Sequence, residues 1–240
     1  LVFIKPNIVL VNFSNVFSAC KFERNISVGK KKKEASVILK ENKSVKTILE
    51  KKERFKGRLR TLKTSFITGV NTKEAIYKEN GCSFRLNVDS CYFSPRLGGE
   101  RLEIAKMVKK NENVLVMFSG VAPYPIVIAK FSKAKKVVSV ELSRECNKYA
   151  LENVKRNKLV GRVEIVQGDV RRILPKMKEK FDRIVMTRPN LEDSFLDVAF
   201  SKIKKNGIIH YYGFCLEDEI EAMKFMILQE AREARKKIKI

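Results

Sequence analysis

The chain has 240 residues, of which 44% are hydrophobic, so it is long and apolar enough for one large domain or two small ones, which excludes a wholly disordered protein. Lys and Arg total 51 against 27 Asp and Glu, and the net charge of +24 favours a polyanionic partner, nucleic acid before an anionic membrane. A lysine-rich proteome would produce the same excess without any function.

Few residues suited to metal or triad chemistry are present. His210 is the single histidine, and the five cysteines include no Cys-x-x-Cys pair. We therefore expect no metal site, no disulfide framework and no Ser-His-Asp triad. The sequence has no apolar run of about 18 residues for a membrane helix, and its apolar opening lacks the basic start of a signal peptide. A cytoplasmic protein without a membrane partner is expected.

The first part of the chain is strongly basic. Residues 21–64 contain 16 Lys and Arg against 5 Glu, which gives a net charge of +11. The run at 29–34 (GKKKKE) is predicted to be a solvated loop, and 44–55 is predicted to be a short helix.

Two β-prone runs follow, at 57–70 and 74–88, and the second contains a turn at Asn80-Gly81. This pattern predicts a small antiparallel sheet with a basic face. Residues 44–98 are accordingly predicted to form a small basic α+β domain that faces RNA, after a poorly defined segment at 1–43.

From residue 99 the pattern alternates between helices and strands. Helices are expected at 99–110, 122–131, 143–159 with Ser143 as N-cap, 170–177, 191–207 closed by Gly207, and 217–233. Strands are expected at 113–118, 135–142, 162–169, 181–189 and 208–214, with another beginning at 236–240. Repeated β-α units predict an α/β fold with a mostly parallel sheet and helices on both faces.

Three consecutive strand ends carry residues suited to an adenosine-type ligand. Gly120 follows the first strand, Glu141 ends the second and suits ribose hydroxyls, and Asp169 ends the third and suits an adenine amino group. A tight turn, a solvated strand end and a helix N-cap explain each of them equally well when taken singly. Because no phosphate-binding P-loop is present, the three together predict S-adenosylmethionine. The predicted cofactor-binding residues are Phe118, Gly120, Val121, Tyr124, Glu141, Leu142, Asp169 and Val170.

The end of the fourth strand carries a proline-containing loop. Thr187 and Asn190 are candidates for hydrogen bonds to a base edge, Arg188 for a phosphate contact, and Pro189 for the wall beside a planar base. The alternative is a simple turn ended by Pro189.

A family resemblance is carried by the stretches 75–105 (AIYKENGCSFRLNVDSCYFSPRLGGERLEIA), 117–130 (MFSGVAPYPIVIAK) and 207–214 (GIIHYYGF), together with Glu141 and Gly168-Asp169. These segments resemble the archaeal and eukaryotic-type tRNA (guanine-N1)-methyltransferases. The resemblance runs from about residue 44 to 235. It implies a Rossmann-like class I methyltransferase, monomeric, that transfers a methyl group from S-adenosylmethionine to N1 of guanine 37, next to the anticodon in the tRNA stem-loop. A sister family transfers the cofactor's aminocarboxypropyl group to a wybutosine precursor, and Arg96 favours the methyl transferase. A non-catalytic tRNA-binding remnant is the third reading.

The resemblance also implies roles for individual residues. Glu100 takes the place of the general base that removes the proton from guanine N1, and Arg60, with Arg58 a close second, the place of the cation that stabilises charge on O6. Tyr92 matches a residue near the base, and Arg96 a nearby anchor. The plainer alternatives are a first-turn acid for Glu100 and a surface charge for Arg60.

The chain departs from the family pattern at three positions. Val116 stands where the family usually has Asp, Ala122 where it often has Gly, and Thr187 where it has the Asn of an Asn-Leu-Pro motif. These changes put cofactor affinity and base contacts in question, or mark a branch with wider specificity for wyosine precursors. Residues 1–43 are expected to be a remnant of a tRNA-binding domain, and 99–240 a methyltransferase domain cut short at its C-terminal end.

Overall fold

A computed structural model of the chain describes residues 2–4, 8–11, 27–53, 55–188 and 193–240. Its centre is a sheet of five parallel strands in the order β11-β10-β7-β8-β9. The strands are β7 (Asn113–Met117), β8 (Lys136–Glu141), β9 (Val163–Gln167), β10 (Phe181–Met186) and β11 (Ile203–Tyr211). Chain order reverses between β7 and β10, which is where ligands bind in open α/β sheets.

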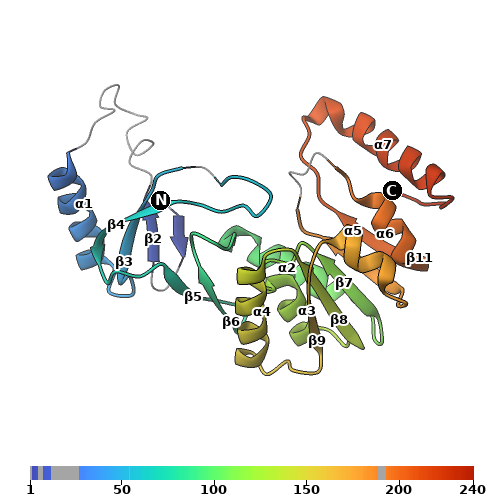
Figure 1. Cartoon of the computed structure of the whole chain (residues 1–240), viewed down its shortest axis with the longest axis horizontal. Coiled ribbons are helices and arrows are strands. Elements are labelled where there is room, and N and C mark those ends of the chain that lie inside the picture. Colours follow the sequence, from blue (N-terminus) through green and yellow to red (C-terminus); the bar gives the residue numbers. More distant parts are fainter. Residues whose placement is uncertain (1, 5–7, 12–26, 54, 189–192) are drawn as a thin grey trace.

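Helices cover both faces of this sheet (Figure 1). Val114 and Val116 of β7 belong to one hydrophobic core, whereas Leu115 and Met117 belong to a second core on the other face. The first core includes α2 (Gly98–Met107), α3 (Pro123–Phe131) and α4 (Arg144–Arg156). The second includes α5 (Val170–Ile173), α6 (Leu196–Lys202) and α7 (Ile220–Glu233). The predicted Rossmann-like α/β fold is confirmed. No helix within the described ranges offers the apolar length that crossing a bilayer requires.

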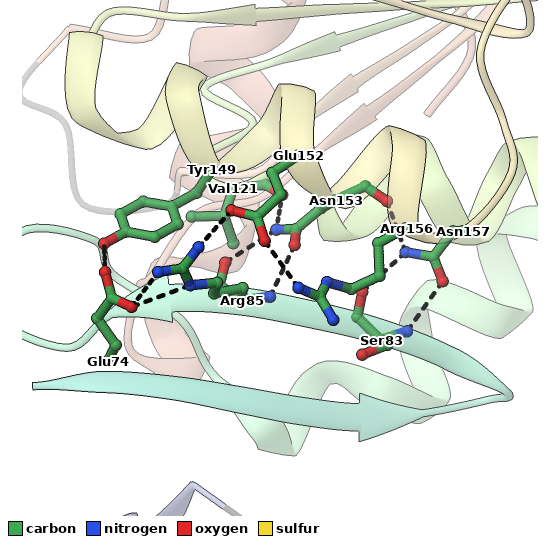
Figure 2. A network of polar contacts seen from close by, with 9 residues as sticks. All are labelled: Glu74, Ser83, Arg85, Val121, Tyr149, Glu152, Asn153, Arg156 and Asn157. Carbon is green, nitrogen blue, oxygen red and sulfur yellow. Dashed lines mark hydrogen bonds and ion pairs between the residues drawn. The ribbon is translucent and has the colours of Figure 1, made fainter. Parts of the chain in front are cut away.

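A β-hairpin docks onto this domain through two asparagines, one in α4 and one at the C-cap of α4 (Figure 2). The hairpin consists of β5 (Glu74–Glu79) and β6 (Cys82–Asn87), which are antiparallel and turn at Asn80-Gly81 as predicted. The side chain of Asn153 accepts from the Arg85 N–H at 2.7 Å and donates to the Arg85 carbonyl at 3.0 Å. Asn157 makes the same pair of bonds with Ser83, at 2.9 and 2.8 Å. The two amides satisfy backbone groups along the edge of β6 and join the hairpin to the α/β domain.

A second sheet lies at the N-terminal end, in the order β1-β2-β3-β4. Its strands are β1 (Val2–Ile4), β2 (Ile8–Val11), β3 (Thr47–Lys51) and β4 (Thr64–Gly69). Helix α1 (Val28–Glu41) packs on this sheet through a small core of Ala35, Val45 and Ile48. The described part of the basic N-terminal region is thus a helix on a sheet.

Two predictions for the basic region were wrong. Residues 44–55 contain strand β3 instead of a helix, because β3 is held between β2 and β4 and buries Thr47, Ile48 and Leu49. The lysine run at 29–34 is the start of α1 instead of a loop. The Ser27 side chain caps that helix, and the Lys, Glu and Ala that follow have high helix propensity.

Two predictions at the C-terminal end also failed. The helix expected at 191–207 ends at Lys202, and Gly207 lies inside β11. A bulge displaces the pairing of β10 with β11, and a Cβ on Gly207 would lie 2.7 Å from the Ile203 side chain and 2.9 Å from the Asp182 carbonyl, so glycine here serves a close backbone approach. The strand expected at 236–240 is not formed, since these residues carry no regular secondary structure.

Strand β10 carries a buried cation, Arg183, which contacts a residue of β11. Arg183 is 1% exposed and donates to Glu112 at 2.8 and 3.1 Å and to the Met107 carbonyl at 2.8 Å. Its third contact is His210 Nε2, at 2.7 Å. Because a guanidinium only donates, His210 is neutral with Nε2 as the acceptor. Burial, and then the Arg183 charge, lower the pKa of His210 to about 4.

The lowered pKa of His210 predicts a loss of stability in mild acid. The unfolded chain takes up a proton near pH 6.5 that the folded chain refuses down to about pH 4, so stability is full above pH 6.5 and falls as the pH drops through this window. The variant His210→Gln keeps an acceptor for Arg183 but has no titrating group at this position. Between pH 6.5 and 5, its free energy of unfolding should therefore fall by about 2 kcal/mol less than that of the parent. Urea unfolding at both pH values measures this; equal losses would contradict it.

Candidate active site

An open pocket lies at the carboxyl ends of β7, β8, β9 and β10. The loop after β6 and the loop at 58–60 close its other sides. Eleven of the residues predicted from sequence line it: Arg60, Tyr92, Phe118, Gly120, Tyr124, Glu141, Leu142, Asp169, Val170, Thr187 and Arg188. Residues far apart in the chain therefore meet in one cavity.

The turn after β7 has an unusual backbone. Phe118, Gly120 and Ala122 all have left-handed φ angles, of 59°, 57° and 65°. Ala122 is therefore an L-residue in a conformation that favours glycine, which gives a physical reason for the glycine that the family pattern has there. Val116, the other departure near this turn, is fully buried in the core.

The Glu141 carboxylate holds this turn in place. Its Oε2 accepts from the Gly120 N–H at 2.8 Å, and its Oε1 accepts from the Ser143 N–H at 2.8 Å. Each oxygen accepts one bond and retains a further lone pair. A residue that lines the pocket thus keeps acceptor capacity for a pair of hydroxyl groups.

Asp169 is both a helix cap and a pocket acid. Its Oδ1 accepts from the Arg171 N–H at 2.9 Å at the start of α5, and its Oδ2 accepts from the Arg58 guanidinium. Burial works to raise the pKa of Asp169, but these two hydrogen bonds and the Arg58 charge hold it below the usual value. The basic loop at 58–60 therefore reaches across to the third strand end.

Arg60 and Tyr92 are stacked on the opposite side of the pocket. The Arg60 guanidinium lies 3.7 Å from the centre of the Tyr92 ring, and the Phe55 ring packs edge-on against the same tyrosine at 4.9 Å. Arg60 itself has a left-handed φ of 50°. The stacking fixes the direction of a cation that would otherwise be mobile, at a gain of about 0.5–2 kcal/mol.

Glu100 lies in the first turn of α2, behind Tyr124, and does not itself line the pocket. Burial, and then a hydrogen bond with Glu100, raise the pKa of Tyr212. Burial, and then the Glu100 charge, raise the pKa of Tyr124 to about 12. The two phenols are thus donors toward the carboxylate, and Tyr124 contacts both Glu100 and the pocket.

The neighbour of Glu100 anchors this helix turn. Arg101 is 1% exposed and donates to both oxygens of Glu79 at 2.6 Å and to the Ser94 carbonyl at 3.1 Å. The Asn80 side chain donates to the Gly98 carbonyl at 2.9 Å. The hairpin turn therefore fixes the start of α2, where Glu100 lies.

The fourth strand end presents Thr187 and Arg188. The Thr187 hydroxyl is within 3.2 Å of the Met117 carbonyl and 3.0 Å of the Phe118 carbonyl, so its hydrogen goes to the backbone and only acceptor capacity remains for a base. The buried Nε of Arg188 has no hydrogen-bond partner among the residues that the structure describes. Burial, and then the charge of Arg60, lower the pKa of Arg188. Pro189 and Asn190 lie outside the described residues.

Two further predicted residues stand away from the pocket lining. Arg96 is exposed in the short 3-10 helix Pro95–Leu97, and the Val121 side chain is buried in the core. Sequence reasoning missed Phe195, which lines the pocket and packs against Phe118 at 5.1 Å, because the pattern places this residue inside a helix predicted at 191–207. It also missed Cys146, in the first turn of α4. Within the described ranges, no group of three His, Cys, Asp or Glu side chains is arranged to hold a metal ion.

The chain is similar to tRNA-modifying enzymes of known identity. It is 41% identical over 177 residues to the tRNA (guanine(37)-N(1))-methyltransferase Trm5b of Pyrococcus abyssi, covering 74% of this chain and 52% of that protein. It is 34% identical over 248 residues to the tRNA (guanine(37)-N(1))/4-demethylwyosine(37)-methyltransferase Taw22 of Nanoarchaeum equitans, covering 82% of each. The chain thus spans about half the length of the first relative.

Solved structures agree with the sequence relatives. The crystal structure of Trm5b from Pyrococcus abyssi matches with a TM-score of 0.80 at 34% identity, covering 96% of this chain and 65% of that one. The complex of aTrm5 with tRNALeu matches with a TM-score of 0.76 at 29% identity, covering 91% and 60%. Methanocaldococcus jannaschii TYW2 in complex with AdoMet matches with a TM-score of 0.65 at 29% identity, covering 79% and 80%.

The model of the TRM5/TYW2 methyltransferase domain matches residues 75–240, which begins within the docked hairpin and includes the whole five-stranded sheet. The family resemblance inferred from the motifs is confirmed. This chain belongs to the TRM5/TYW2 methyltransferase domain family.

Proposed function

We propose that the protein is a tRNA methyltransferase that transfers a methyl group from S-adenosylmethionine to N1 of guanine 37. The observation that carries the proposal is the meeting of two residue sets in one pocket: Glu141 and Asp169 on one side, and the Arg60-Tyr92 stack on the other. The first set suits an adenosyl group and the second a planar base. The tRNA partner and the cofactor follow from related proteins, of which aTrm5 is known in complex with tRNALeu and TYW2 in complex with AdoMet.

The residues present fit S-adenosylmethionine. Glu141 retains acceptor capacity for ribose hydroxyls, Asp169 for an adenine amino group, and Leu142 and Val170 supply apolar walls. Phosphate-binding motifs are lacking in the sequence, as suits a cofactor without a pyrophosphate. When bound, the cofactor supplies an electrophilic methyl group on a sulfonium.

In the proposed reaction, this chain's residues manage the proton and the charge on the base. N1 of guanine carries a proton and becomes nucleophilic once that proton leaves, so we assign its removal to the Glu100 carboxylate. Negative charge then moves to O6, where the Arg60 guanidinium, held by Tyr92, stabilises it. We assign the positioning of the Glu100 carboxylate to the hydroxyls of Tyr124 and Tyr212, with Tyr124 standing between Glu100 and the pocket.

Charge supports the choice of RNA as the substrate. Arg58, Arg60 and Arg188 converge on the pocket, and among the described residues only Arg58 of these three has a direct carboxylate partner there. We assign Arg188 to a backbone phosphate of the flipped nucleotide, and Arg96 and the basic residues of 44–98 to phosphates further along the stem-loop. The same proposal includes a monomeric state, a cytoplasmic location and a division of the chain into three parts, at 1–43, 44–98 and 99–240.

Nucleoside analysis tests the proposal directly. The protein is incubated with an unmodified tRNA transcript that bears guanine 37 and with methyl-labelled S-adenosylmethionine, and the digested nucleosides are identified. We expect 1-methylguanosine, which a transcript with adenine at position 37 would not give. An added aminocarboxypropyl mass would instead establish the sister activity. If the protein binds tRNA but forms no modified nucleoside, it is a non-catalytic tRNA-binding protein.

Replacing Glu141 should weaken cofactor binding. Glu141→Ala removes the acceptor for both ribose hydroxyls and releases the Gly120 turn, so cofactor affinity should fall about 10- to 100-fold, the scale of charge-assisted hydrogen bonds. Titration calorimetry with S-adenosylmethionine measures the affinity, and tRNA affinity should stay nearly unchanged. Glu164→Ala, at an exposed glutamate on the adjacent strand, is the matched control. Unchanged affinity in Glu141→Ala would remove the ribose assignment.

A further inference from the structure

We propose that Cys91 and Cys146 form a site of reversible oxidative modification, at which the two thiols join in a disulfide under a mild oxidant such as hydrogen peroxide. Their Sγ atoms lie 3.0 Å apart, about 1 Å longer than a disulfide bond. They are 55 positions apart in the chain, so the contact is a product of the tertiary fold. The two side chains already point at each other.

The environments of the two sulfurs suit thiol chemistry. Cys91 and Cys146 are 1% and 3% exposed, and both are reduced. The Cys146 thiol donates to the Cys91 sulfur, and this hydrogen bond, ahead of the opposing effect of burial, lowers the pKa of Cys91. This hydrogen bond therefore favours the thiolate of Cys91, which is the reactive form, while Cys146 keeps its proton.

Access to the pair runs through the pocket. Cys146 is part of the pocket lining, although its total exposure is small. A molecule as small as hydrogen peroxide reaches a sulfur at that wall. The reaction oxidises one thiol to a sulfenic acid with loss of water, and the second sulfur then displaces a second water, so two thiols and one peroxide give one disulfide and two waters.

The cross-link would join two walls of the pocket. Cys91 immediately precedes Tyr92, which stacks on Arg60, and Cys146 lies in the first turn of α4, where its N–H donates to Ser143 at 3.2 Å. Ser143 in turn donates to Glu141. A disulfide here ties the base side of the pocket to the cofactor side.

Peptide mass spectrometry without reduction tests the cross-link. The full chain in a Cys20→Ser/Cys215→Ser background, which removes intermolecular pairing through those positions, is treated with hydrogen peroxide, blocked with an alkylating agent and digested with trypsin. We expect peptides 86–96 and 145–148 to appear joined, lighter than their sum by two hydrogens, and to separate after a thiol reductant. Cys91→Ser and Cys146→Ser should each lose the joined species, whereas Cys82→Ala, at another buried cysteine, should keep it.

The outcome that overturns the site is the absence of the joined peptides at a peroxide dose that fully oxidises Cys215 in the parent chain. Sulfinic acid on either cysteine in place of the cross-link would overturn it equally. Addition of S-adenosylhomocysteine forms a separate arm that rests on the proposed function: it should slow the cross-link at least threefold by filling the pocket. Equal rates would reject the pocket as the route while the mass readout still decides the cross-link itself.

Discussion

Glu100→Gln is expected to lower the rate of methyl transfer at least about 100-fold, the usual scale for loss of a general base. The amide keeps an acceptor oxygen for Tyr124 and Tyr212 but has no affinity for the N1 proton at neutral pH. Binding of cofactor and tRNA should remain within about twofold, because neither needs the negative charge. Single-turnover assays with labelled cofactor and saturating enzyme measure the chemical step apart from binding.

Helix α2 supplies the control for this variant. Glu103→Gln changes the same residue type on the same helix at an exposed position, and its rate should match the parent. If Glu100→Gln also keeps a near-normal rate, Glu100 is not the base, and its place behind Tyr124 is then structural. A loss of tRNA binding in Glu100→Gln without a loss of rate at saturation would lead to the same conclusion.

The parts of the site that sequence predicted share one physical property. Gly120, Glu141 and Asp169 are placed by local signals, since each follows a short apolar strand and precedes a helix. In a parallel sheet such strand ends meet at one edge, so local pattern is enough to bring them together. The same logic predicted the order of elements from α2 to α7, with errors only where β11 begins and at the C-terminal end.

The parts that sequence missed depend on contacts between distant segments. Nothing near Arg58 indicates that it pairs with Asp169, 111 positions away. Residues 47–51 have a helix-compatible composition, and only their pairing with two other strands makes them a strand. The contact between Cys91 and Cys146 belongs to the same class, because neither cysteine has a partner at a recognisable spacing. Tertiary pairing overrides local preference in each case.

The motif that carried the family resemblance has a structural explanation. Glu79 and Asn80 belong to the hairpin turn, and Gly98 and Arg101 to the first turn of α2. Arg101 binds both oxygens of Glu79, and a Cβ on Gly98 would lie 2.9 Å from the Glu79 carboxylate. The conspicuous residues around Glu100 therefore form a clamp that fixes where the helix begins. The role proposed for Glu100 as a general base depends on such support, because a catalytic group has to be held within about 0.5 Å of its productive position.

Glu79→Ala should therefore be the most destabilising of the variants considered, with a loss of about 3–5 kcal/mol in the free energy of unfolding. The side chains of Arg101 and Glu79 are only 2% and 6% exposed, and removal of Glu79 leaves the Arg101 guanidinium buried with no carboxylate partner. Urea unfolding followed by circular dichroism measures the change. Glu221→Ala, at an exposed ion pair on α7, should cost less than about 1 kcal/mol in the same assay.

A double variant separates the cost of an unpaired charge from the loss of the attraction itself. If the unpaired guanidinium causes the instability, Glu79→Leu/Arg101→Met should recover most of the loss, because apolar side chains of similar volume replace a buried pair with little penalty. The double variant should nevertheless transfer methyl groups more slowly than the parent, since the clamp behind Glu100 is gone. A Glu79→Ala protein no less stable than Glu221→Ala would show that the pair is solvated, and the clamp would then explain neither the fold nor the position of Glu100.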